Sequence, residues 1–85
     1  MLTSAFFGIS IRMFWREHGP PHFHAAYGDQ EAIIDIRELR VIRGALPRRA
    51  LALVLEWAAF NREALMEDWD LCTELKSPLP IPPLE

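Results

Sequence analysis

The segment HFHAAYGDQEAIIDIR, residues 22–37, decides the fold of this chain. Gly28-Asp29 divides it, and a two-residue turn with glycine in the first central position is typical of a tight β-hairpin. The flanking residues 22–27 and 31–37 are rich in aromatic and β-branched side chains, which favour strands. The segment therefore predicts two antiparallel strands joined by a short turn.

A further strand is expected before this hairpin, over residues 9–16, because apolar and polar residues alternate there apart from Phe14. Residues 17–21 form a loop, since the Gly19-Pro20-Pro21 run restrains the backbone and removes two N–H donors. A shorter fourth strand is expected over residues 39–43. These three to four strands make an antiparallel meander.

Pairing the strands through these two turns separates two faces, because successive side chains of a strand point to opposite sides. A slip of one residue would exchange the faces. The apolar face, the expected core, carries the rows Trp15–Phe23–Ile34 and Met13–Ala25–Ala32. The other face carries the rows Arg16–His22–Asp35, Phe14–His24–Ile33 and Arg12–Ala26–Glu31.

The second half of the chain predicts helices that cover the apolar face. Pro47 suits the start of a helix, where a missing N–H costs nothing, and we expect two helices that meet near Phe60 and Asn61, with Asn61 as a cap. The tail is rich in proline and extended, and packs on the domain through Leu79, Ile81 and Leu84. The apolar residues at helical spacing are Leu51, Val54, Leu55, Ala58, Leu65, Trp69 and Cys72.

The fold class is therefore α+β, in a single domain over residues 1–85. Residues 1–44 form the meander, residues 45–76 the helical part and residues 77–85 the tail. With 51% hydrophobic and 25% charged residues, the chain has the composition of a globular protein. Its one cysteine, Cys72, excludes an intramolecular disulfide, fits a reducing cytosol and is expected to be buried.

The chain shows no sign of a membrane or export segment. The N-terminus has no basic stretch before its apolar residues and no small-residue cleavage pattern, so we expect no signal peptide. The longest apolar run, residues 50–55, is too short to span a bilayer. We therefore expect a cytoplasmic protein without a membrane partner.

All three histidines, His18, His22 and His24, lie within seven residues of one another. His22 and His24 are two apart on a strand, so they point to the same face and suit a divalent transition metal. Asp35 is the third candidate ligand, and Glu17 or His18 adds another from the loop. Against a metal, the pairing places Arg16 beside His22, and the spacing matches no zinc signature.

The same cluster also suits general acid–base catalysis. Asp35 would orient His22, and Arg16 with Arg12 would bind a phosphate or carboxylate. No serine or cysteine nucleophile lies near, so a hydrolase or nuclease of this kind would use water. In the non-enzymatic alternative, which we favour, His22 and His24 satisfy local hydrogen bonds and the face binds a partner without a cofactor.

Residues 12–28 resemble the signature of a bacterial family of small proteins, domain-of-unknown-function family 4160, and the likeness extends over nearly the full chain. Phe14 and Asn61 depart from the pattern, which has tyrosine and histidine there. The resemblance implies no catalytic residues. It implies a protein partner and a regulatory role, because genes of the family often form toxin–antitoxin-like pairs. The matching residues are Glu17-His18, Pro20-Pro21, His22-Phe23-His24, Tyr27-Gly28, Gly44-x-Leu46-Pro47-x-Arg49, Leu53-Val54-x-x-Trp57, Glu63-Ala64-Leu65, Trp69 and Pro83-Leu84.

Although the net charge is −3, a basic segment lies at the predicted junction between the sheet and the helices. Residues 37–49 hold five arginines against one acid, whereas residues 50–85 hold seven acids against two basic residues. Arginines near a helix N-terminus can bind phosphates, so nucleic acid is an alternative partner. Pairing with Glu56, Glu67 or Asp68 is the structural alternative. The five arginines are Arg37, Arg40, Arg43, Arg48 and Arg49.

Taken together, these patterns favour a non-enzymatic module that binds a small partner protein, as one component of a toxin–antitoxin-like pair. The first alternative is the metal- or His-dependent hydrolase with His22, His24, Asp35 and Arg16. The second is a nucleic-acid-binding regulator. The expected binding residues lie on the histidine face and in the basic segment: His18, His22, His24, Arg12, Arg16, Arg43, Arg48 and Arg49.

Overall fold

The hairpin around Gly28-Asp29 forms in the register that its turn predicts. A computed structural model describes residues 1–85, and in it His22–Tyr27 (β3) pairs with Gln30–Asp35 (β4). His22 lies opposite Asp35, and Tyr27 lies opposite Gln30. Gly28 has φ +62°, a backbone conformation that glycine adopts at no steric cost.

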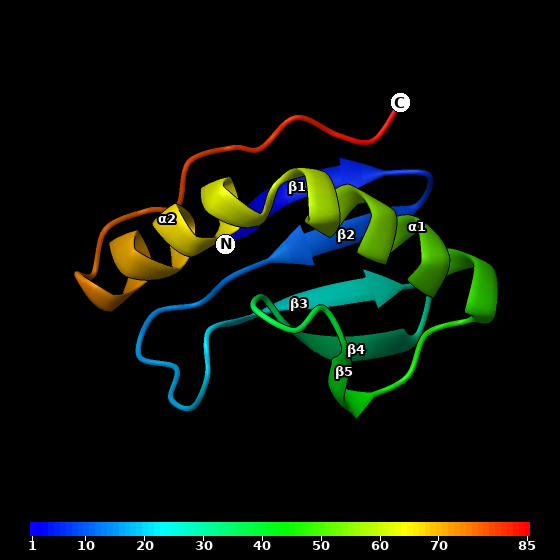
Figure 1. Cartoon of the computed structure of the whole chain (residues 1–85), viewed down its shortest axis with the longest axis horizontal. Coiled ribbons are helices and arrows are strands. Elements are labelled where there is room, and N and C mark those ends of the chain that lie inside the picture. The colour runs from blue at the N-terminus through cyan, green and yellow to red at the C-terminus, as the bar shows by residue number, and fades with distance from the viewer.

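The sheet has five antiparallel strands in chain order rather than three to four (Figure 1). The strand missing from the sequence prediction is the first, in which buried Thr3 and Ser4 hide the apolar alternation. With two helices after the sheet, the α+β class is confirmed. The other elements are Leu2–Phe6 (β1), Ile9–Arg12 (β2), Val41–Gly44 (β5), Arg48–Phe60 (α1) and Arg62–Thr73 (α2).

The predicted register between β2 and β3 is wrong by two residues. β2 ends at Arg12, which lies opposite His24, whereas Arg16 and Phe14 lie in the loop and have no partner in the strand ladder. The cause is the loop, which has nine residues, 13–21, instead of five. A shift of two keeps every strand side chain on its own face, so the apolar rows remain in the core apart from Trp15.

Two more predictions near the loops are corrected. Trp15 is 45% exposed rather than in the core, and its indole N–H donates to the carbonyl of Lys76. β5 begins at Val41, because Leu39 has a left-handed backbone and Asp35 holds the turn before it through the N–H of Glu38. Both differences arise from loop geometry that apolar periodicity does not encode.

The two helices lie on one face of the sheet and meet at Asn61, as expected (Figure 1). Asn61 Nδ2 donates to the carbonyl of Trp57, so its side chain closes α1 and does not cap α2. Trp57 is buried against Phe6 and Phe23, and the expected burial of Cys72 is confirmed. Neither helix is long and apolar enough to cross a membrane.

The proline-rich tail runs beside β1 (Figure 1). The N–H of Ile81 donates to Thr3, the Trp57 indole donates to the carbonyl of Pro82, and the N–H of Leu79 donates to Asp68. Ile81 is buried, whereas Leu79 is exposed, against expectation. The tail therefore covers one edge of the sheet, and β5 forms the other, open edge.

Candidate functional site

His22 begins β3 and is held by the loop on one side and by α2 on another. Its Nδ1–H donates to the carbonyl of Pro20 at 2.9 Å, so Nε2 carries the lone pair of the neutral ring. The Trp69 ring of α2 lies 4.9 Å from the imidazole, centroid to centroid. The side chain is only 7% exposed. The loop and α2 thus cover the start of the face that the sequence predicts to be polar and open.

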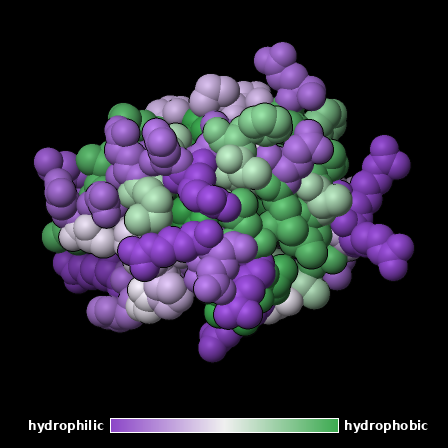
Figure 2. Space-filling view, viewed as in Figure 1, coloured by the Kyte–Doolittle hydropathy of each residue, from purple (hydrophilic) through white to green (hydrophobic).

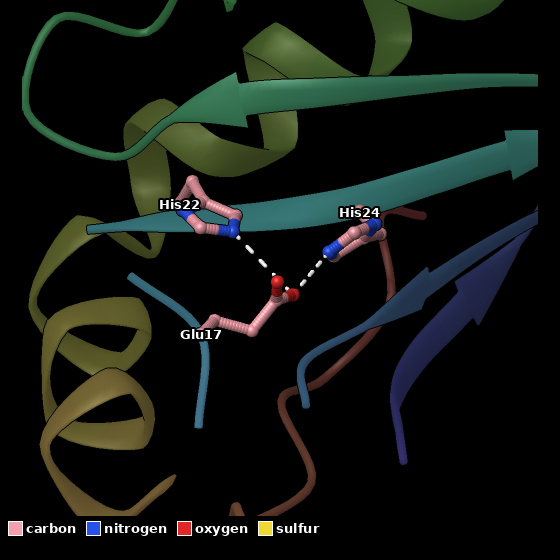
Figure 3. Close-up of side chains that lie close together, drawn as sticks. All are labelled: Glu17, His22 and His24. Atoms are coloured by element: carbon pink, nitrogen blue, oxygen red, sulfur yellow. Dashed lines mark hydrogen bonds and ion pairs between the residues drawn. The ribbon is translucent and has the colours of Figure 1, made fainter. Parts of the chain in front are cut away.

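His24 lies two residues along β3, and its Nε2 forms a hydrogen bond with the carboxylate of Glu17. His22 Nε2 is 3.4 Å from the same Glu17 oxygen. Figure 3 shows Glu17 reaching from the loop toward both rings. The edge of Phe14 packs on His24 at a centroid distance of 4.8 Å. Two elements therefore bring one carboxylate and two imidazoles together.

The carboxylate of Glu17 is stabilised in its charged form. Partial burial opposes ionisation, but hydrogen bonds and charge attraction from His24 and His22 outweigh it and hold its pKa below the ordinary 4.5. His24 Nδ1 is buried without a hydrogen-bond partner, and Glu31 Oε2 lies 3.6 Å from it. The cluster thus contains an unsatisfied ring nitrogen beside a second acid.

The other predicted site residues form no hydrogen bond or ion pair with this cluster, although Asp35 and Arg12 lie opposite His22 and His24 in the ladder. Asp35 lies opposite His22 in the ladder, but its carboxylate accepts the N–H of Glu38 at 2.8 Å. Arg16 lies exposed in the loop at φ +62°. His18 is exposed, and Arg12 donates to Ser10. No hydrogen bond or ion pair joins Asp35 or Arg16 to His22, so the arrangement predicted for a hydrolase is not formed.

The arginines of the basic segment are exposed, and only Arg40 has an ion-pair partner, Glu38 at 2.8 Å. The pairing with Glu56, Glu67 or Asp68 does not occur. Arg48 and Arg49 form the first turn of α1. The arginines without an ion pair are Arg37, Arg43, Arg48 and Arg49.

The outer face of α1, which we define as its exposed residues Ala52, Glu56, Ala59 and Phe60, is the surface that sequence reasoning missed. Beyond its first turn α1 carries one charged residue, Glu56. Phe60 is 79% exposed, and hydrophobic residues gather over α1 on the right of the view in Figure 2. A surface helix normally has a polar outer side. The sequence pattern that could have revealed this surface is the run of residues 50–60, in which Glu56 is the one residue that is not apolar.

A cavity of about 280 Å³ lies beside the start of α1. The Phe7 and Tyr27 rings on its wall are 60% and 42% exposed, and Leu53 and Arg49 complete the lining on the α1 side. Aromatic residues with arginine are the types that dominate protein interfaces. The cavity is therefore a second partly apolar surface, between the start of α1 and the hairpin turns.

The meander, the two helices and the partly buried Glu17–His22–His24 cluster define a small α+β domain. The chain belongs to the family described as Domain of unknown function (DUF4160), whose model matches residues 8–70. The match contains β2 to β5 and α1, and it confirms the resemblance seen in the sequence. No curated protein and no solved structure matches the chain.

Proposed function

We propose that this protein is a non-enzymatic module that binds a partner protein through the outer face of α1. One observation carries the proposal. A helix that is already anchored in the core by Val54 and Trp57 also exposes apolar side chains on its outer side, where Glu56 is the one charged residue beyond the first turn. Such a helix is stable in water, but it exposes surface that a second protein would remove from solvent.

The charges around this face indicate the chemistry of the partner. Arg48 and Arg49 at the start of α1 have no ion pair, and the N-terminal end of a helix adds partial positive charge. We therefore propose an amphipathic helix as the ligand, with its apolar side on Ala59 and Phe60 and acidic residues facing the two arginines. Helix-to-helix packing of this kind is a common recognition mode.

We further propose that this partner is the second component of a toxin–antitoxin-like pair in the bacterial cytoplasm, the role that the family resemblance implies. The hydrolase alternative has less support, because Asp35 and Arg16 have no bond to His22. The nucleic-acid alternative uses the same arginines, and it is an outcome of the test below.

The experiment places the photo-crosslinking residue p-benzoylphenylalanine at position 52 in living cells, with position 67 of α2 as the control. Ala52 and Glu67 are both exposed on helices, so neither replacement disturbs the core. We expect one protein adduct at position 52 and none at position 67. An adduct with nucleic acid, or with another copy of this chain, would overturn the proposed ligand.

The identified partner is then purified and titrated against the unlabelled protein. Arg49→Glu reverses the charge beside the helix, and Ala52→Glu adds a charge to its outer face. We expect each to weaken binding about 10-fold or more, as loss of a central interface contact does. Glu67→Lys is the matched control and leaves affinity unchanged. Equal effects of all three variants would contradict the assignment of the surface.

A further inference from the structure

We propose that Glu17, His22 and His24 bind a divalent transition-metal ion such as zinc. One nitrogen from each ring and one carboxylate oxygen lie within 4.8 Å of one another. Two imidazoles and a carboxylate are a known zinc ligand set, and they occur with three protein ligands and one open position. This inference is independent of the partner surface on α1.

The orientation of His22 is already that of a metal ligand. A ligating histidine donates its other ring N–H to a carbonyl or carboxylate, which fixes the tautomer and the direction of the ring. His22 Nδ1 has this bond to the carbonyl of Pro20. Its Nε2 therefore points into the cluster, toward Glu17.

A metal would also account for the unsatisfied atom of His24. The Nε2 of this ring faces Glu17, while Nδ1 is buried without a hydrogen-bond partner and lies 3.6 Å from Glu31. With a metal on Nε2, the proton of the neutral ring resides on Nδ1, where a small movement of Glu31 gives it an acceptor. Both histidines would then have a second partner of the usual kind.

The surroundings hold the two histidine ligands in place and limit their contact with water, whereas Glu17 is 28% exposed. The side chains of His22 and His24 are 7% and 13% exposed, and Trp69 and Phe14 pack on the two rings. The cation that argued against a metal at the level of sequence, Arg16, lies outside the strand ladder. The cation opposite His24 in the ladder is Arg12, whose guanidinium donates to Ser10. The carboxylates of Glu17 and Glu31 lie beside the rings.

The ligand atoms select the kind of ion. Imidazole nitrogen suits zinc, cobalt, nickel and iron, whereas magnesium and calcium prefer oxygen ligands. A bound ion would join the loop of residues 13–21 to β3, because Glu17 comes from the loop and the histidines from the strand. The alternative is that Glu17 forms ordinary ion pairs with two histidines, and the test separates these cases.

The first test titrates the full chain with cobalt(II), followed by visible absorption, and with zinc, followed by calorimetry. We expect one ion per chain and no heat with magnesium. His22→Ala, His24→Ala and Glu17→Gln should each weaken zinc binding by about 100-fold or more, beyond the loss seen for outer-shell residues. His18→Ala is the matched control, because His18 is exposed in the same loop. It should bind zinc like the unaltered protein.

A second measurement needs no variant, so it tests the metal site even if a substitution prevents folding. In nitrogen-15 NMR spectra of the unaltered protein, zinc should shift the ring nitrogens of His22 and His24 and leave those of His18 in place. The absence of a shift at millimolar zinc, or equal weakening by His18→Ala, overturns the metal site. Neither result tests the proposed partner surface on α1, because no partner protein is present in these experiments.

Discussion

The two helices differ in what their outer sides carry, although they have nearly equal lengths of 13 and 12 residues and share one core. α1 has only Glu56 beyond its first turn, whereas the outer side of α2 exposes Glu63, Glu67 and Asp70. One buried side is enough to hold α2 in the fold. The second apolar side of α1 is therefore not required by this domain and is available for another molecule.

The largest expected effect comes from the inner side of α1. Trp57→Ala removes a ring that is 1% exposed and contacts Phe6 and Phe23, together with a hydrogen bond to Pro82. We expect the free energy of unfolding in urea to fall by about 3–5 kcal/mol. Leu65→Ala is the counterpart on α2, with an expected loss of about 2–5 kcal/mol. A loss below about 1 kcal/mol in either would show that the helix is not anchored as described.

The anchors of the tail give an intermediate effect. α1 holds the tail through the neutral indole of Trp57. α2 holds it through the carboxylate of Asp68, which is 1% exposed and accepts the N–H of Leu79 at 2.8 Å. Asp68→Ala leaves that N–H without its acceptor, so we expect unfolding to become easier by about 1–3 kcal/mol. Asp68→Asn keeps an acceptor and should cost less, and an equal cost for both variants would argue against this bond.

Only the anchor on α2 should respond to pH. Burial raises the pKa of Asp68 above its ordinary 3.8, against the effect of the Leu79 hydrogen bond. Below that ordinary value the group is protonated in both states. As the pH rises, the unfolded chain releases its proton first, so the contribution of Asp68 to stability falls.

This dependence is measured by urea unfolding of the unaltered protein and Asp68→Asn across the acidic range. We expect the difference between them to shift in favour of the variant as the pH rises from about 3 toward neutrality. Glu17 contributes the opposite slope, since its pKa is lowered and its stabilisation is lost as the pH falls below 4.5. A pH-independent difference would contradict the raised pKa of Asp68.

The smallest effect on stability is expected on the outer side of α1. Phe60 is 79% exposed, so Phe60→Glu should change the free energy of unfolding by less than about 0.5 kcal/mol. The same variant should reduce the binding of a hydrophobic dye such as anilinonaphthalene sulfonate, whereas Glu67→Lys on α2 should not. Dye binding that is unchanged by Phe60→Glu would place the exposed apolar surface elsewhere.

The sequence predicts most of the sheet wherever a turn type fixes its geometry. The β3–β4 register is correct because a two-residue turn with Gly28 allows one pairing. The β2–β3 register fails because Pro20 and Pro21 indicate a loop but not its length. β1 is not predicted, because the buried polar residues Thr3 and Ser4 interrupt the apolar alternation typical of a strand.

The histidine cluster is predicted only in part, for a related reason. His22 and His24 share a face through strand alternation alone, which is a local property. The choice among Glu17, His18 and Asp35 as their acidic or ligating neighbour depends on loop conformation. A short aspartate side chain readily bonds a backbone N–H three residues on, and Asp35 does so with Glu38.

The tail has a consequence for the order in which the fold is completed during synthesis. Every strand of the meander pairs with its neighbour in the chain, so the sheet can assemble while the protein is still being made. The outer edge of β1 is different, because the Thr3 carbonyl accepts the N–H of Ile81, which comes 78 residues later in the chain. Until that segment leaves the ribosome, the nascent domain has two open edges, and both can pair with another chain.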